Sequence, residues 1–246
     1  LCWKLAAVLR GHASERLLDS YEPERRTVTG RNVERAIENA LNQLRVGQAL
    51  GLDPKAGADA NWAALGRLWS GRPEDSEQRC EVLRVFASHS MEFGEHNVEH
   101  GYTYASAAIA GDGSPAPTPV DDIRVYVPST RPGSPLPHAE VENADGERCA
   151  LMDLVPPGHF LLIAGEDGAA WCEAAEKLRL PLDALRIGHL AGEYRDPRCA
   201  WLRQREITAQ GAVLVRPDRF IAWRSLASNP QPEAALARAL KEVLSR

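Results

Sequence analysis

Apolar residues recur at helical spacing through most of the first hundred residues. Leu5, Val8 and Leu9 share one side of the opening segment, and Gly11 follows as a suitable helix end. Ser14 can cap a second helix, in which Pro23 is expected to limit or kink the chain. The spacing predicts helices at residues 1–10, 14–22, 28–46, 61–69 and 74–93.

The third predicted helix is amphipathic and is expected to start or break near Gly30. Its apolar residues recur three to five positions apart and are expected to face inward: Val28, Val33, Ile37, Ala40, Leu41 and Leu44. In the fifth helix, Val82, Leu83, Val85 and Phe86 are expected to face inward.

The pattern changes to alternating strands and helices after residue 158. Buried strands are predicted at residues 159–164 and 185–190, with a helix at 168–178 between them. A hairpin follows at 211–215 and 220–223, with Pro217 and Asp218 in its turn, and a helix from Pro232 closes the chain. The crossover predicts a parallel strand pair, beside which the hairpin adds antiparallel strands. The fold class is therefore α/β.

Seven prolines between Gly111 and Pro137 separate these two patterns. Extended structure is expected at residues 101–109 and again at 123–127. We predict helices of one region at 1–110, a Pro-rich linker at 111–122 and a second domain at 123–246. The linker stretch is expected to lie mainly on the surface, and residues from Ile123 onward to fold alone.

Composition narrows the function classes. The chain has 246 residues, 44% of them hydrophobic, and a net charge of −5, which is typical of a packed globular protein. No dense basic run favours nucleic acid, and no apolar run approaches the roughly 20 residues that cross a bilayer. The five cysteines never form CxxC, which indicates reduced thiols and a cytoplasmic protein.

Several residues could carry chemistry, and each also has a simpler interpretation. His96, Glu99 and His100 spell the HxxEH zinc pattern, although Gly101 follows at once and a polar helix end is favoured. Cys172 lies near a helix start without a resolving cysteine, so packing is favoured over redox chemistry.

Three other sets of residues are interpreted structurally. The seven-residue spacing of Trp62 and Trp69 predicts core or interface positions rather than a substrate pocket. Arg25 and Arg26 are expected to lie on a solvated helix face paired with Glu22 and Glu24. His138 is expected to make a structural hydrogen bond.

Four segments resemble the single-component FAD-dependent aromatic hydroxylases. Residues 1–6 resemble the family's NLxWKLA segment, and residues 18–28 its LLDSYExERxPV segment, with Thr27 where proline is usual. Residues 131–139 are similar to its RPGxxxPHA segment, and residues 211–224 to its terminal hairpin. Phenol and 2,4-dichlorophenol hydroxylases are the members that this chain resembles most.

This resemblance implies a helical remainder of the flavin and substrate region, followed by a thioredoxin-like domain without CxxC. It further implies a parent enzyme that uses FAD, NAD(P)H and O2 to hydroxylate phenolic rings. The family's GxGxxG and substrate residues lie upstream of the first matched segment, so we expect a C-terminal fragment that is inactive alone.

No residue of this chain is assigned a catalytic, cofactor-binding or metal-binding role. The expected partner of the parent enzyme is a phenolic small molecule. Binding to nucleic acid or to a membrane is not expected, and the sequence leaves open whether the protein forms a homo-oligomer. The alternative is a non-catalytic thioredoxin-like module for structure or dimerisation.

Overall fold

The computed structural model describes residues 1–90, 92 and 94–246. Contacts divide the chain into two compact units. We call the first the sheet unit; it comprises Leu1–Thr27, His100–Pro119 and Tyr126–Arg246. We call the second the helical unit; it comprises Val28–Glu99 and Val120–Val125. This division differs from the expected boundaries at residues 110 and 123, because residues 1–27 share a core with the sheet.

The sheet unit contains one mixed sheet in the order β2-β1-β5-β4-β3-β6-β7. Its strands are β1 (Glu140–Glu142), β2 (Arg148–Ala150), β3 (Phe160–Gly165), β4 (Leu182–Gly188), β5 (Tyr194–Arg195), β6 (Ala212–Val215) and β7 (Ile221–Ser225). The sequence pattern missed β1, β2 and β5, since strands of two or three residues at one side of a sheet carry too few apolar positions.

The predicted strand order is confirmed at the centre of the sheet. β3 and β4 are parallel, with Ile163 opposite Leu185, and α6 (Ala169–Lys177) connects them. β6 runs antiparallel to both β3 and β7, so the predicted hairpin forms with Arg219 donating to the carbonyl of Arg216 in its turn. The α/β fold class is therefore confirmed.

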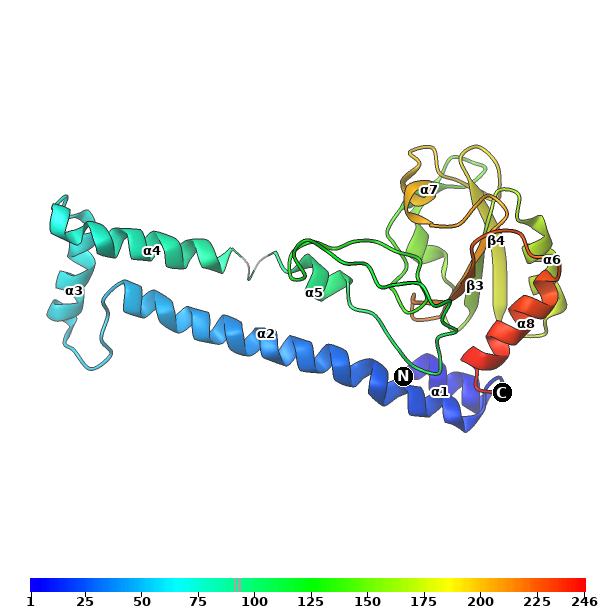
Figure 1. Ribbon diagram of the computed structural model, residues 1–246, viewed down its shortest axis with the longest axis horizontal. Helices are drawn as coiled ribbons and strands as arrows, with labels where there is room; N and C mark the ends of the chain where they lie inside the picture. Colours follow the sequence, from blue (N-terminus) through cyan, green and yellow to red (C-terminus); the bar gives the residue numbers. More distant parts are fainter. Residues whose placement is uncertain (91, 93) are drawn as a thin grey trace. The chain divides into compact units, whose positions relative to one another are not determined.

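Both faces of this sheet are covered, which is why β3 is buried along its whole length. Leu162 and Ala164 point into the core beneath α6 and α8 (Pro232–Val243), while Leu161 and Ile163 point into the core that holds Trp201 of α7 (Ala200–Gln204). Figure 1 shows α6 and α8 on one side of β3 and β4, and α7 on the other.

The start of the chain completes the first of these cores. Trp3 of α1 (Cys2–Leu9) meets Phe160 edge to face at 5.7 Å between ring centroids, and Leu17 of the 3-10 helix η1 (Glu15–Ser20) is fully buried. Burial of such large side chains stabilises the unit by roughly 1.5–3 kcal/mol each.

The proline-rich stretch divides into two parts. Residues 111–128 are exposed or half-buried, as expected. Where extended structure was expected at 123–127, residues 122–124 form a turn closed by Val125 donating to the carbonyl of Asp121, and residues 125–127 form no strand. Most of residues 129–137 are buried along the hairpin, with an isolated bridge between Pro135 and Phe220, so the surface prediction is wrong there. Residues 101–109 form no strand either.

The described part of the helical unit contains further helices. The long α2 (Tyr21–Ala49) enters it at Val28; α3 (Ala58–Gly66), η2 (Arg67–Trp69), η3 (Pro73–Asp75), α4 (Ser76–His89) and α5 (His96–His100) follow. The predicted end of α4 near Phe93 lies outside the described residues. The described residues contain no helix that is both long enough and apolar enough to cross a lipid bilayer.

Neither Pro23 nor Gly30 interrupts α2, which corrects the expected break. Pro23 lies in the first turn, where its missing N–H would have no helical acceptor. Gly30 has open space around it, and the helix continues through it.

The expected inward face of α2 is confirmed at Val28, which is 5% exposed, and is wrong beyond it. Val33, Ile37, Leu41 and Leu44 are each more than half exposed, while Arg35, Asn39 and Asn42 are partly buried. On α4, Val82 and Val85 are buried as predicted, but Leu83 and Phe86 are exposed. Periodicity located the apolar stripe of α2 and could not say whether another part of this chain covers it.

Candidate functional site: a buried ion cluster

A cluster of buried charges lies at the tip of the β6–β7 hairpin, within the sheet unit. Arg216 follows β6 directly, and its side chain is completely buried. Its Nη1 and Nη2 donate to the two carboxylate oxygens of Glu24 at 2.6 and 3.0 Å. Nε and Nη2 donate to Asp218 at 3.0 and 2.7 Å, and Nη1 also reaches the carbonyl of Ala108 at 3.4 Å. All five guanidinium N–H groups therefore have acceptors.

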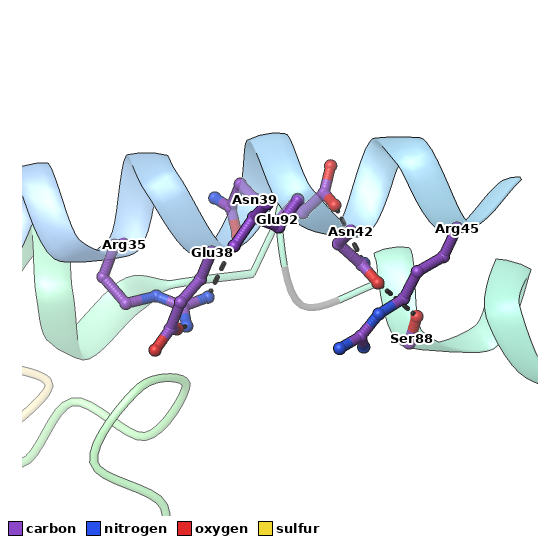
Figure 2. A pocket seen from close by; sticks show the side chains of 8 residues that line it. Arg35, Glu38, Asn39, Asn42, Arg45, Ser88 and Glu92 are labelled. Atoms are coloured by element: carbon purple, nitrogen blue, oxygen red, sulfur yellow. Dashed lines mark hydrogen bonds and ion pairs between the residues drawn. The ribbon is translucent and has the colours of Figure 1, made fainter.

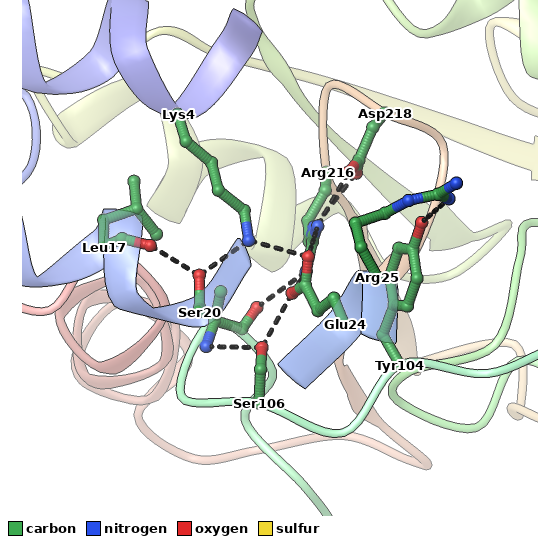
Figure 3. Close-up of polar contacts among 10 residues, drawn as sticks. Lys4, Leu17, Ser20, Glu24, Arg25, Tyr104, Ser106, Arg216 and Asp218 are labelled. Carbon is green, nitrogen blue, oxygen red and sulfur yellow. Dashed lines mark hydrogen bonds and ion pairs between the residues drawn. The ribbon is translucent and has the colours of Figure 1, made fainter. Parts of the chain in front are cut away.

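Glu24 connects the hairpin to the first 27 residues. It lies in the first turn of α2 and is 3% exposed. Beyond Arg216, it accepts hydrogen bonds from Lys4 Nζ and from Ser106 Oγ, each at 2.7 Å. Lys4 Nζ also donates to Ser20 Oγ at 2.6 Å (Figure 3). One carboxylate thus ties α1, α2 and residue 106 to the hairpin.

Aromatic rings enclose the guanidinium. The Cζ atom of Arg216 lies 5.0 Å from the centroid of Trp3 and 5.5 Å from that of Tyr104. Tyr104 stacks on Phe220 at 4.0 Å between centroids. Cation–π contacts of this kind contribute about 0.5–2 kcal/mol, with larger values at desolvated positions.

The cluster combines two acids with two bases, so it is electrically balanced. Burial acts to raise the pKa of Glu24, but the hydrogen bonds from Arg216 and Lys4 hold that pKa below its usual range. Burial lowers the pKa of Lys4, with Arg216 adding to the effect and Glu24 opposing it. Burial also acts to lower the pKa of Arg216, yet Glu24 and Asp218 raise it above its ordinary value.

The charged groups of the cluster supply one another's hydrogen-bond partners. This arrangement indicates that the cluster holds chain segments together rather than transferring protons. A general acid or base needs a proton site that a substrate can reach. Glu24, Lys4 and Arg216 are each at most 3% exposed. Buried charges that are fully hydrogen-bonded stabilise one conformation, because breaking a single partner leaves an uncompensated charge.

The turn between β3 and α6 does not fit the pyrophosphate of FAD. The strand–turn–helix of β3 and α6 carries glycines at positions 165 and 168, which superficially suits a phosphate loop. A Cβ on Gly165 would meet the carbonyl oxygen of Ala209 at 2.4 Å, so close packing explains this glycine. Between the two glycines lie Glu166, paired with Arg205 at 2.6 Å, and Asp167, whose negative charges oppose a phosphate.

The HxxEH residues lie on α5, a helix of five residues. His96, Glu99 and His100 are all exposed, and one ligand atom of each lies within 4.8 Å of the others. The exposure and short length accord with a polar helix end. We assign no metal role to them.

The five cysteines are free thiols. Burial raises the pKa of Cys172 to about 11, which disfavours the thiolate that redox chemistry requires. Burial likewise raises the pKa of Cys149. Cys199 Sγ lies 3.3 Å from His189 Nδ1, a contact that sequence spacing did not indicate.

Other residues singled out in the sequence take no part in the ion pairs of this cluster. Trp62 and Trp69 are 70% and 77% exposed, so a core position is wrong for both. Arg26 pairs with Glu22 at 3.0 Å on an exposed helix face, as predicted. Arg25 instead donates to the hydroxyl of Tyr104 at 3.3 Å.

His138 is exposed and makes no side-chain hydrogen bond to another described residue, contrary to expectation. Gly133, five residues earlier, has a structural role. Its φ is +96°, and a Cβ there would lie 2.2 Å from the carbonyl oxygen of Tyr104.

The helical unit has a polar cavity of about 340 Å³. Arg35, Asn39 and Asn42 of α2 line it together with Ser88 and Glu92 (Figure 2). Asn42 donates to Glu92 at 3.1 Å and accepts from Ser88 at 3.2 Å, so the lining groups largely bind one another.

The pattern of charges along the sequence did not indicate the ion cluster. Lys4, Glu24 and Arg216 all lie inside the segments that resemble the family. Their place in those segments was the signal by which the sequence marked them. Residues separated by up to 192 positions pair here, and charge pattern along the chain does not encode such pairing.

Comparisons with known families place the two sides of the cluster in different regions. Residues 1–36 match the family described as "FAD binding domain", and residues 129–246 match "Aromatic-ring hydroxylase, C-terminal". Lys4 and Glu24 lie in the first match; Arg216 and Asp218 lie in the second.

Curated relatives resemble the chain along its whole length. 2,4-Dichlorophenol 6-monooxygenase of Delftia acidovorans is 38% identical over 250 residues, covering 100% of this chain and 42% of that protein. Phenol 2-monooxygenase of a Pseudomonas species is 34% identical over 241 residues, covering 96% and 39%. The chain thus spans about two fifths of the length of these relatives.

A solved structure is also similar to this chain. The flavin-dependent monooxygenase PieE, in complex with FAD and substrate, is 34% identical, with a TM-score of 0.90 over 100% of this chain and 42% of that one. The chain is therefore similar along its length to part of the flavin-dependent aromatic-ring hydroxylases, and residues 129–246 match the family described as "Aromatic-ring hydroxylase, C-terminal".

Proposed function

We propose that this chain is the C-terminal part of an FAD-dependent monooxygenase that hydroxylates phenolic rings with NAD(P)H and O2. The observation that carries the proposal is the presence, in one chain, of an FAD-binding match and an aromatic-ring hydroxylase match in the order of the family. FAD, when bound to the parent, supplies the oxygen chemistry. Phenol and chlorinated phenols are the substrate class, as the names of the relatives suggest.

Within that enzyme, residues 123–246 serve as a thioredoxin-like domain without redox chemistry, and residues 1–110 as part of the flavin and substrate region. The parallel β3–β4 pair beside an antiparallel hairpin supports the first assignment. The raised pKa of Cys172 supports the lack of thiol chemistry. A cytoplasmic location accords with five free thiols.

The test compares two proteins. The protein encoded by the complete reading frame should purify with bound flavin and convert 2,4-dichlorophenol or phenol to a hydroxylated product when NADH or NADPH is supplied. The 246-residue chain alone should purify without flavin, because its sequence contains no GxGxxG and the turn between β3 and α6 does not fit a pyrophosphate. A longer protein that neither binds FAD nor consumes NAD(P)H with these phenols would contradict the proposal, and flavin retained by the short chain would contradict the assignment of the cofactor site.

A further inference from the structure

Two matched regions of different kinds meet at Arg216. Every element that the cluster joins on one side, namely α1, η1 and the first turn of α2, lies within the FAD-binding match at residues 1–36. The guanidinium and Asp218 belong to the C-terminal match. The buried side chain of Arg216 therefore connects the C-terminal match to the FAD-binding match.

The geometry makes this connection directional. A bidentate pair fixes the orientation of a guanidinium and a carboxylate, because two parallel hydrogen bonds resist rotation. Asp218 accepts hydrogen bonds from the Nε–Nη2 edge of the Arg216 guanidinium, and Glu24 accepts them from the Nη1–Nη2 edge. Glu24 then holds Lys4, and Lys4 holds Ser20, whose hydroxyl donates to the carbonyl of Leu17.

We infer that Arg216 is a positioning residue: acting through Glu24 and Lys4, it sets the conformation of α1 and η1, and so shapes the FAD-binding region from the C-terminal domain. This inference rests on the proposed function for its consequence in the enzyme. The positioning itself concerns only residues of this chain and is testable without flavin.

A second buried arginine on the same hairpin provides a matched control. Arg224 of β7 is 8% exposed and donates to Asp112 and Glu206 at 2.6 Å each. It also donates to Ser114 and to Thr130. None of these four partners lies within residues 1–36, so Arg224 has the same ionic character without the connection.

The first experiment measures amide hydrogen exchange along the 246-residue chain in Arg216→Met and Arg224→Met. In Arg216→Met, amides of Leu5–Leu9 and of η1 should exchange at least about tenfold faster relative to those of β3, because Glu24, which holds Lys4, is no longer fixed by Arg216. In Arg224→Met the acceleration should fall on residues 112–130 and leave α1 protected. Arg216→Lys, which keeps the charge and loses the bidentate geometry, should give an intermediate result.

Two outcomes overturn the inference. One is an Arg216→Met protein in which α1 keeps its protection relative to β3. The other is equal acceleration at every amide in Arg216→Met and Arg224→Met, which a purely structural contribution would produce. If Arg216→Met does not fold, Arg216→Lys decides by the same comparison.

The second experiment uses the protein of the complete reading frame and measures the dissociation constant for FAD by flavin fluorescence. Arg216→Met should bind FAD at least about tenfold more weakly than Arg224→Met. Each variant is measured the same number of degrees below its own melting temperature. Equal FAD affinity would overturn the effect on the FAD-binding region. A wild-type protein that binds no FAD would contradict the proposed function, while the exchange experiment would still decide whether Arg216 positions α1.

Discussion

At the scale of single residues, charge burial dominates the region that joins the two family matches. Glu24 and Lys4 belong to residue types that are seldom fully buried without partners. Here each faces opposite charge, and Arg216 uses every donor it has. A buried pair adds little net stability when formed but costs about 3–5 kcal/mol when one partner is removed. The cluster therefore specifies a conformation more than it increases stability.

Glu24 should make the free energy of unfolding depend on pH in the acidic range. Its pKa in the folded chain lies below the ordinary value of 4.5, so the unfolded chain binds more protons as pH falls below that value. The stabilisation from Glu24 is complete above pH 4.5 and is lost as pH falls through the lowered pKa. Melting temperatures measured from pH 7 down to pH 3 should converge for wild type and Glu24→Gln. A constant difference between the two proteins over that range would contradict the role of this carboxylate.

Gly133 offers a residue-scale test of the segment that approaches the hairpin. Gly133→Ala should destabilise the chain by about 3 kcal/mol or more, because a positive φ and an overlap with the Tyr104 carbonyl act together. Gly146 has φ +81° with open space around it, so Gly146→Ala measures the backbone contribution alone, about 1–2 kcal/mol. Urea unfolding measures both. Equal losses would show that residue 104 does not approach Gly133 closely.

At the scale of elements, α2 behaves differently from its sequence pattern. Partly buried positions between Arg31 and Asn42 are polar, and the apolar residues Val33, Ile37 and Leu41 are more than half exposed. A helix usually gains its stability by burying such an apolar stripe. In α2, hydrogen bonds such as those of Arg35 and Asn39 with Glu95 take that place within the helical unit.

Because α2 continues through Gly30, a substitution at this residue is expected to stabilise the protein. Gly30→Ala should raise the free energy of unfolding by about 0.5–1 kcal/mol, because alanine restricts the unfolded chain and meets nothing within 4 Å in the helix. Circular dichroism during thermal unfolding provides the measurement. If the helix broke at Gly30, as its sequence alone suggested, the substitution would leave stability unchanged or lower it.

At the scale of the whole chain, residues distant in sequence complete one core. Trp3 and Leu17 belong to the same core as Phe160, Leu162 and Leu214, although more than 140 residues separate the first pair from the others. Independent folding of Ile123–Arg246 stays a prediction, and this shared core predicts that the shorter piece is less stable than the full chain.

Leu17→Ala tests this arrangement in the intact chain. The side chain is completely buried, so its loss should destabilise the sheet unit by about 2–5 kcal/mol. Leu9→Ala, at a position 85% exposed on the neighbouring helix, should change stability by less than about 0.5 kcal/mol. Tryptophan fluorescence and amide exchange of β3 report the effect. If Ile123–Arg246 melts at the temperature of the full chain and Leu17→Ala changes nothing in β3, residues 1–27 do not belong to this core.

The sequence by itself determined the local elements whose signal lies within a few neighbouring residues. The continuous apolar run of β3, the turn at Pro217 and Asp218, and the apolar face of α8, whose Leu236 and Leu240 are buried, all follow from short-range sequence patterns and turn chemistry. The family also followed from short segments that contain Lys4, Glu24 and Arg216. Only the tertiary structure decided what those charges do, because pairing between Glu24 and Arg216 depends on how chain segments 192 positions apart pack. The same reason explains the exposed stripe of α2, since periodicity defines a face and packing decides whether that face is covered.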